Sequence, residues 1–320
     1  MSIKKSPPIL GALGALGALG ALGALLASIS LAASDTGQRG IVPEDVIQAR
    51  PPANAAPGKP KPGNSKPGNS NLDKAKPKYQ PLNPQVVASL RHPSAASELG
   101  VTIWRLRPAA AADTGARILV QEAAETAELI PERVSSTSRL NAGDRVRLTL
   151  ESPERGYLYV IDRERYSSGD SGTPYLIFPT TRTRGGDNQV AGGKLIDIPS
   201  QSDRPNFFTL RRSKPDQVEE ELTVLLTPEP LEGIAIGAEA LALTNAQVAA
   251  WEKQWGGGKP EVFELTGGAG QAWTQAEQAA AADGTRLLTQ DDPPPQTVYR
   301  VAVKPGAPLA VEVRLRYRPR

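Results

Sequence analysis

Seven or eight short segments of strand-like sequence, separated by polar turns, fill the chain between residues 99 and 230. Apolar and polar side chains alternate most clearly over residues 145–150, a period of two that predicts a strand with one buried face. Residues 157–161 are apolar on both faces, which is typical of a central strand. Strands do not alternate with helical patterns here, so a parallel βαβ sheet is not expected. The pattern predicts a mainly β domain, an antiparallel β-sandwich that is Ig-like or a small barrel, over residues 85–233.

Residues 234–320 have a mixed pattern. Thr244 can cap a helix that runs to about Trp255, and Thr274 with Glu277 has the capping-box spacing that begins a second short helix. The chain ends in two alternating segments, which predict a β-hairpin. We expect an α+β extension of two short helices and a β-hairpin, either packed on the sandwich or folded as a small second domain.

Residues 1–33 have the layout of a secretion signal. Lys4 and Lys5 precede an uncharged apolar run, residues 9–33, that ends in small residues. Because about 20 apolar residues can also span a bilayer as a helix, a cleaved signal peptide and an uncleaved inner-membrane anchor both remain open. In either case we expect the rest of the chain to be exported, as a periplasmic, secreted or otherwise envelope-located protein.

Residues 34–84 are rich in Pro, Gly, Asn and Lys, and the pentapeptide Lys-Pro-Gly-Asn-Ser occurs twice in succession from Lys61. Such a segment buries too little apolar surface to offset its ordering entropy, which predicts a disordered linker. Residues 39–80 hold eight basic and three acidic side chains, a net of +5, against +3 for the whole chain. The lysines of residues 59–78 either keep a spacer soluble or make weak electrostatic contact with anionic envelope components. The rest of the chain lacks a basic face, so no nucleic-acid partner is expected.

The residue types present restrict the chemistry. The chain has no cysteine and one histidine, His92, so we expect no disulfide, no zinc site and no Ser-His-Asp triad. No phosphate-binding or dinucleotide-binding glycine pattern is present, and no calcium-loop pattern. The sequence therefore predicts a protein without cofactor or metal that is not an enzyme. One catalytic alternative is a hydrolase of envelope polysaccharide that uses a pair of carboxylates, drawn from Asp162, Glu164, Asp170 and Asp187.

Two polar loops, residues 163–174 and 179–190, are the candidate binding surface. Arginine and tyrosine in adjacent loops on a rigid scaffold are suitable contact residues. The opposing interpretation is that the second loop is a plain turn whose polar side chains bond the backbone. The candidate binding residues are Arg163, Tyr166, Arg182, Arg184, Asp187 and Asn188.

Three stretches carry a resemblance to a known family. They are Asn-Ala-Gly-Asp-Arg-Val-Arg-Leu-Thr-Leu from Asn141, Gly-Tyr-Leu-Tyr-Val-Ile-Asp from Gly156, and Pro-Tyr-Leu-Ile-Phe-Pro-Thr-Thr-Arg from Pro174. Over residues 99–233 the chain resembles the bacterial family catalogued as domain of unknown function 4384. The resemblance implies a β-rich module of exported bacterial proteins and supplies no catalytic residues. We therefore expect a non-catalytic binding module of the bacterial envelope whose partner is a protein or an envelope polymer. A structural subunit of an envelope assembly is a further alternative.

Overall fold

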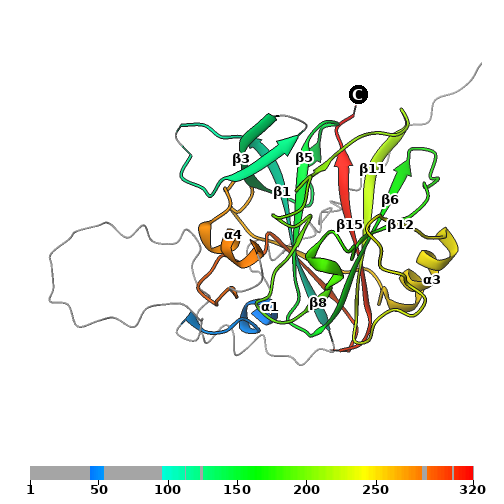
Figure 1. The fold of residues 1–320 in the computed structure, drawn as a ribbon. Helices are drawn as coiled ribbons and strands as arrows, with labels where there is room; N and C mark the ends of the chain where they lie inside the picture. The colour runs from blue at the N-terminus through cyan, green and yellow to red at the C-terminus, as the bar shows by residue number, and fades with distance from the viewer. Residues whose placement is uncertain are drawn as a thin grey trace, which may run out of the picture. The chain divides into compact units, whose positions relative to one another are not determined.

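The computed structural model describes residues 44–53, 96–111, 113–122, 125–282, 287–304 and 306–319. The predicted signal or anchor, most of the predicted linker and His92 lie outside these residues. Within these ranges no helix is long and apolar enough to cross a membrane. The described residues are mainly β, with their strands in two sheets and a few short helices (Figure 1).

Sheet A is built around the long strand β1 (Ser97–Pro108). β1 pairs antiparallel with β5 (Arg145–Glu151), with β14 (Thr297–Val301) and with β3 (Glu125–Val134). The β14 and β3 pairings follow one another along β1, because β14 takes its first residues and β3 its last. The other described strands of sheet A are β2 (Ile118–Glu122), β9 (Ile196–Ile198), β10 (Phe208–Thr209) and β13 (Glu261–Glu264).

Sheet B is built around β11 (Gln217–Thr227), which lies between β6 (Gly156–Tyr166) and β15 (Leu309–Tyr317). Both pairings are antiparallel, whereas β4 (Arg139–Leu140) pairs with the end of β15 in parallel. The remaining strands of sheet B in the described ranges are β7 (Tyr175–Phe178), β8 (Gln189–Val190) and β12 (Leu241–Ala242).

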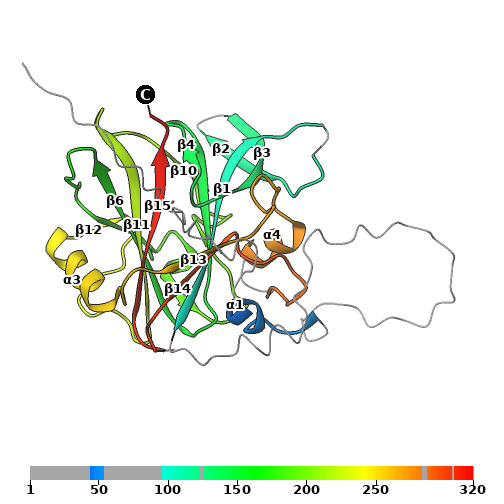
Figure 2. The ribbon, with the colours of Figure 1, turned by 180° about the vertical axis from the view of Figure 1, so that it is seen from behind.

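The two sheets face each other across an apolar core (Figures 1 and 2). In β5 the side chains of Val146, Leu148 and Leu150 are buried in that core, as their alternation predicts. The prediction of only one buried face is wrong, because Arg147 and Thr149 on the other face are buried too, and Arg147 pairs with Asp197. From sheet B the even-numbered residues of β6 and β11 enter it, among them Val160 and Val224. The predicted sandwich-like, mainly β fold is confirmed, and the two sheets are not closed into a barrel.

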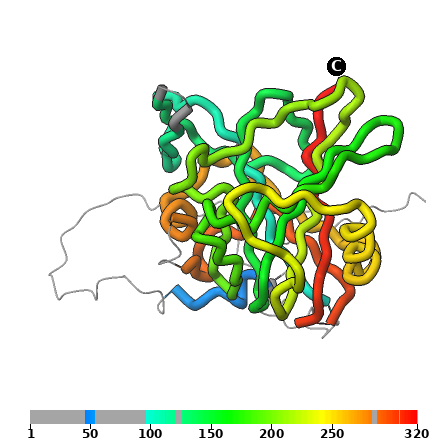
Figure 3. Tube along the Cα trace, turned by 45° about the vertical axis from the view of Figure 1, so that its right-hand side comes forward, coloured from blue at the N-terminus to red at the C-terminus, as the bar shows by residue number. Residues whose placement is uncertain are grey.

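Short helices cover the outer faces of the sheets. α3 (Asn245–Trp255) begins where predicted, because the Thr244 hydroxyl accepts a hydrogen bond from the Gln247 amide. It packs through Val248 on the outer face of sheet B and lies against β15 (Figure 3). α4 (Gln275–Ala282) has the predicted capping box, and its alanines join a second cluster around Trp104. The two remaining described helices are α1 (Glu44–Gln48) and the 3₁₀ helix η2 (Arg184–Gly186). α1 lies inside the predicted linker, and the prediction of disorder is wrong for residues 44–53, because Val46 is buried and Arg50 is buried against Glu151.

The predicted C-terminal hairpin is wrong in its pairing. β14 and β15 follow one another in sequence, but β14 bonds to β1 and β13 in sheet A while β15 bonds to β11 and β4 in sheet B. The two strands therefore belong to different sheets. The alternation of these residues predicts one buried face for each strand. A strand can bury that face in either sheet, so the alternation does not show which strand is its partner. Residues 234–320 therefore supply strands to both sheets.

Candidate functional site

The first predicted loop is shorter than expected. β6 continues to Tyr166, because β11 is long enough to pair with it as far as Gln217. Arg163 is consequently a strand residue, with only 4% of its surface exposed. Tyr166 is also buried, and its hydroxyl donates to the Glu164 carboxylate. Neither side chain is presented on a loop.

The second predicted loop does lie at the surface, and its polar residues are largely paired, either within the loop or with neighbouring segments. Arg182 forms an exposed ion pair with Glu239, and Arg184 contacts Asp187 at 2.8 Å. The Asn188 side chain is buried and donates to the Leu158 carbonyl at 2.9 Å, so it holds the loop onto β6. We find no contact in the described ranges that joins these residues to Arg163.

Asp187 is stabilised as an anion. Burial opposes its charge, but the Gln189 amide, Arg184 and Lys194 outweigh burial and lower the pKa of Asp187 below its ordinary value. A carboxylate in this state cannot act as a proton donor at neutral pH.

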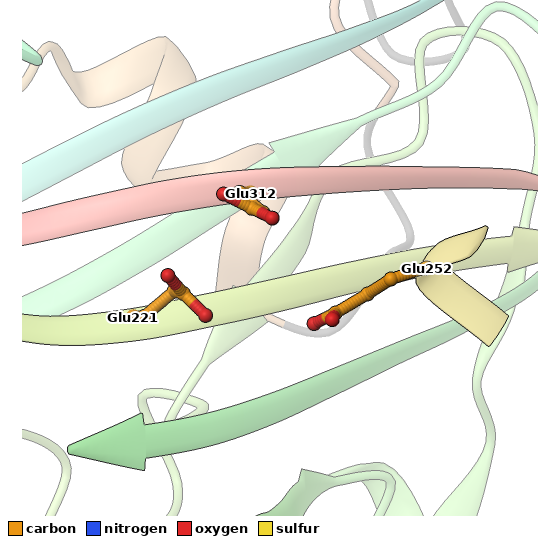
Figure 4. A group of neighbouring side chains, drawn as sticks. All are labelled: Glu221, Glu252 and Glu312. Atoms are coloured by element: carbon orange, nitrogen blue, oxygen red, sulfur yellow. The ribbon is translucent and has the colours of Figure 1, made fainter. Parts of the chain in front are cut away.

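Arg163 leads instead to a group of three glutamates on the outer face of sheet B. Glu221 comes from β11, Glu252 from α3 and Glu312 from β15, and one carboxylate oxygen from each lies within 4.8 Å of the others (Figure 4). The strand register places Glu221 between Arg163 of β6 and Arg314 of β15. The fold thus builds a row of alternating charge across three strands.

The arginines neutralise this group. Glu221 Oε1 accepts hydrogen bonds from Arg163 at 2.5 Å and Arg165 at 2.6 Å, and Arg163 also reaches Glu252 at 2.7 Å. Burial alone would raise the pKa of Glu221, but the bonds from Arg165 and Arg163 outweigh burial and lower it. Arg314 contacts both Glu312 and Glu221, at 3.0 and 3.6 Å. A divalent ion would have to displace these guanidinium groups, so the geometry describes a charge-balanced network and not a metal centre.

A groove of about 620 Å³ opens beside this network, and we call it the β15 groove. Its volume lies in the range of roughly 300–1,000 Å³ that small-ligand sites occupy. Tyr299, Val262 and Val311 give it apolar surface, and the backbone of residues 256–258 forms part of its wall. The charged side chains that line it carry both signs: Glu252, Glu312, Lys253, Lys259, Arg314 and Arg316.

The groove lies where two strand edges meet. β15 pairs with β11 along one edge, whereas β4 covers the other edge only at Arg316 and Tyr317. Over residues 309–315 that edge has no strand partner in the part of the chain that the structure describes. β13, which contributes Val262, pairs with β14 alone. Backbone amides and carbonyls at such an edge are free to bond another extended chain.

A second, smaller cavity of about 180 Å³ lies inside the sandwich near the end of β15. Asp162 and Glu220 line it, together with apolar residues from both sheets. Burial, and then the charges of Glu220 and Glu164, raise the pKa of Asp162 to about 8. Of the four predicted carboxylates, Asp162 therefore carries its proton at neutral pH.

Most of the groove was missed by sequence reasoning. One signal was visible, because Glu252 falls on the same helical stripe as Val248 and Trp251, where an apolar residue is expected. Glu221 and Glu312 gave no comparable signal, since acidic residues on a strand are ordinary on a wet face. Only the cross-strand register brings them to Glu252.

The fold and the groove define a sandwich-like, mainly β protein with a mixed-charge groove along an open strand edge. No protein-family model matches the sequence, and no curated protein and no solved structure gives a significant match.

Proposed function

We propose that this chain is an exported binding module of the bacterial envelope that is not an enzyme and holds its partner in the β15 groove. The observation that carries the proposal is the coincidence of a ligand-sized groove with the unpaired edge of β15. Lys4 and Lys5 followed by the apolar run of residues 9–33 support export.

The chemistry of the groove favours an extended, peptide-like partner. The edge of β15 offers backbone hydrogen bonds, which bind any extended chain regardless of its sequence. The charged lining of the groove carries both signs, with Lys253 and Lys259 beside the network of glutamates and arginines, and this suits a ligand that carries both amino and carboxyl groups. Peptide-containing envelope polymer and an extended protein segment share this chemistry.

The test is co-sedimentation of the protein with purified cell-wall sacculi and with envelope membranes, at low and high salt. We expect pelleting that survives high salt. We also expect a loss of about tenfold or more in affinity when Glu312→Lys is combined with Lys259→Glu, because the charges of both lining residues are then reversed. The control is Arg182→Ala, Arg184→Ala and Asp187→Ala together, which leaves the groove intact.

The opposite pattern, with binding lost in the loop variant and kept in the groove variant, would assign recognition to residues 179–190 instead. Pelleting only at low salt, and only when residues 54–84 are present, would reduce the interaction to screened charge. Residues 44–53 are kept in both forms, because Val46 and Arg50 are buried.

Hydrolysis of envelope polysaccharide is kept as a second candidate by one observation. A carboxyl whose pKa is raised to about 8 in a cavity is suited to general-acid catalysis. This function predicts turnover of a polysaccharide that Asp162→Asn abolishes and Asp187→Asn leaves unchanged. Release of reducing ends from sacculi measures it, and no release by the unaltered protein would eliminate it.

A further inference from the structure

The small cavity is lined by Leu315, near the end of β15, and by residues 208–211 in and after β10. The even-numbered residues of β6 point into the core, so Asp162 continues the inward series of Leu158 and Val160. Glu220 continues the inward series of β11 in the same way. The fold thus places two carboxyl groups at positions where the alternation calls for apolar residues.

The walls around these carboxyl groups are apolar. Sheet A contributes side chains of β5 and of the β10 segment, and sheet B contributes a leucine each from β11 and β15. At about 180 Å³ the cavity is below the usual volume of a site for a whole small molecule, and suits a group the size of one side chain. The apolar wall residues are Val146, Leu148, Ile177, Phe208, Leu210, Leu222 and Leu315.

Each carboxyl group has one oxygen without a hydrogen-bond partner. Asp162 Oδ1 and Glu220 Oε2 are both shielded from solvent and accept no bond in the structure. The other oxygen of Glu220 is satisfied, because the Tyr317 hydroxyl and the Gln217 amide each donate to it at 2.8 Å. Buried oxygens without a hydrogen-bond donor are uncommon in folded proteins, and each of them would be stabilised by a donor.

No cation of the described chain supplies that donor. Arg212 lies over the Tyr317 ring and Lys214 over the Tyr166 ring, and neither forms an ion pair with Asp162 or Glu220. Arg211 is exposed at the rim. The third carboxylate nearby, Glu164, accepts from Tyr166 and Ser213, and it adds negative charge.

We propose that this cavity binds a primary ammonium group carried on a short apolar stem, with Asp162 Oδ1 and Glu220 Oε2 as its acceptors. An ammonium has three donors and no acceptor, so it satisfies both orphaned oxygens, while its methylene stem packs against the leucine and valine walls. An anion would be repelled by the carboxyl groups, and a neutral alkyl chain would leave the oxygens unsatisfied. A lysine side chain and a free alkyl diamine share this chemistry.

The inference does not depend on the β15 groove.

Binding of the ammonium group releases a proton, because a cation between the two carboxyl groups favours the charged form of Asp162, which carries a proton at neutral pH. Affinity therefore rises as the pH increases through about 8 and falls again when the amine itself loses its charge near 10.4. The other polar and charged groups near the pair are Tyr317, Gln217, Glu164, Thr209, Arg211 and Arg212.

The experiment is isothermal titration calorimetry of residues 34–320 with n-pentylamine, n-pentanol and pentanoate, at pH 7 and pH 9. We expect n-pentylamine alone to bind, several-fold more tightly at pH 9 than at pH 7. Titrations in two buffers of different ionisation enthalpy should show release of a proton on binding. The affinities of 1,5-diaminopentane and Nα-acetyl-lysine amide are then compared. Tighter binding of the first indicates a free diamine as the ligand, and tighter binding of the second indicates a lysine side chain.

Asp162→Asn should lose the n-pentylamine signal, and Asp170→Asn, an exposed carboxylate that bonds Ser168, should keep it. Glu220→Gln provides the same test if Asp162→Asn proves unfolded by circular dichroism. Equal binding of n-pentylamine and n-pentanol, or n-pentylamine binding that neither carboxyl variant changes, would overturn the proposal. So would the absence of binding at millimolar amine.

Discussion

At the scale of single residues, the buried charges of this protein divide into those with an opposite charge beside them and those without. Arg50 with Glu151, Arg133 with Glu277 and Arg147 with Asp197 are pairs in which both side chains are almost fully buried. Asp162 and Glu220 have no such partner. The first kind stabilises local structure only as long as both members are present.

Arg50 shows what a complete pair does. Its guanidinium forms two 2.7 Å bonds to Glu151 and donates to three backbone carbonyls of residues 289–293. Arg50→Ala should lower the free energy of unfolding by about 3–5 kcal/mol, because Glu151 is left buried and unpaired. Urea unfolding measures this. Arg117→Ala removes a pair that is about half exposed and should cost no more than about 0.5 kcal/mol. Equal losses of unfolding free energy in Arg50→Ala and Arg117→Ala would contradict the importance of the buried Arg50–Glu151 pair.

Asp162 makes the stability depend on pH. In the unfolded chain an aspartate has a pKa of about 3.9, whereas burial raises the pKa of Asp162 to about 8. Between these values the folded protein holds a proton that the unfolded chain has lost, so stability falls as the pH rises from about 4 to 8. One such group contributes a slope of up to about 1.4 kcal/mol per pH unit. Chemical unfolding from pH 5 to pH 8 should show this decline, and Asp162→Asn should flatten it. An unchanged slope would assign the titration to another group.

At the scale of the element, α3 fixes the position of Glu252 and hence one side of the groove. Its first turn depends on the bond from the Gln247 amide to the Thr244 hydroxyl, at 3.1 Å. Thr244→Ala should cost about 1 kcal/mol, and Thr244→Ser, which keeps the hydroxyl, should restore most of it. Thermal unfolding compares the two. A serine variant as unstable as the alanine variant would show that the methyl group and not the cap matters.

Local patterns were sufficient for elements whose signals lie within a few residues. The apolar series of β5, the Thr244 cap and the capping box of Thr274 with Glu277 each involve neighbours in sequence, and the structure confirms them. The burial of the polar face of β5 could not be predicted in this way, because the partner of Arg147 is Asp197, 50 residues away. Partner choice is different, because it depends on contacts between distant segments. β14 and β15 have the periodicity of a hairpin and yet bond to different sheets.

The same reason limits prediction of the site. Arg163 was assigned to a loop because its neighbours are polar, although its polar partners, Glu221 and Glu252, are supplied by β11 and α3. Asp162 was recognised as a candidate carboxylate, but its inward orientation follows from the length of β6. Composition identified the charged residues, and only the register shows which of them are neutralised.

At the scale of the whole molecule, residues 234–320 complete both sheets. β15 lies next to β11 within sheet B, and β14 covers the first half of β1 in sheet A. A chain that stops at residue 233 should therefore fail to fold cooperatively, because each sheet then lacks a strand that covers the core. Circular dichroism and urea unfolding of such a truncated chain provide the measurement. A cooperative transition there would show that residues 85–233 fold as a separate domain.

The pairing of β1 with β14 joins residues about 200 positions apart, Ser97 with Val301 among them. Native contacts this distant in sequence close slowly, because the entropy of a very large loop is lost before they form. β3 and β5 can pair with β1 soon after they are synthesised, but residues 97–101 of β1 cannot bond to β14 until nearly the whole chain has been made. For the exported protein that we propose, this delay favours translocation, because the complete sandwich cannot form before the last strands have been synthesised.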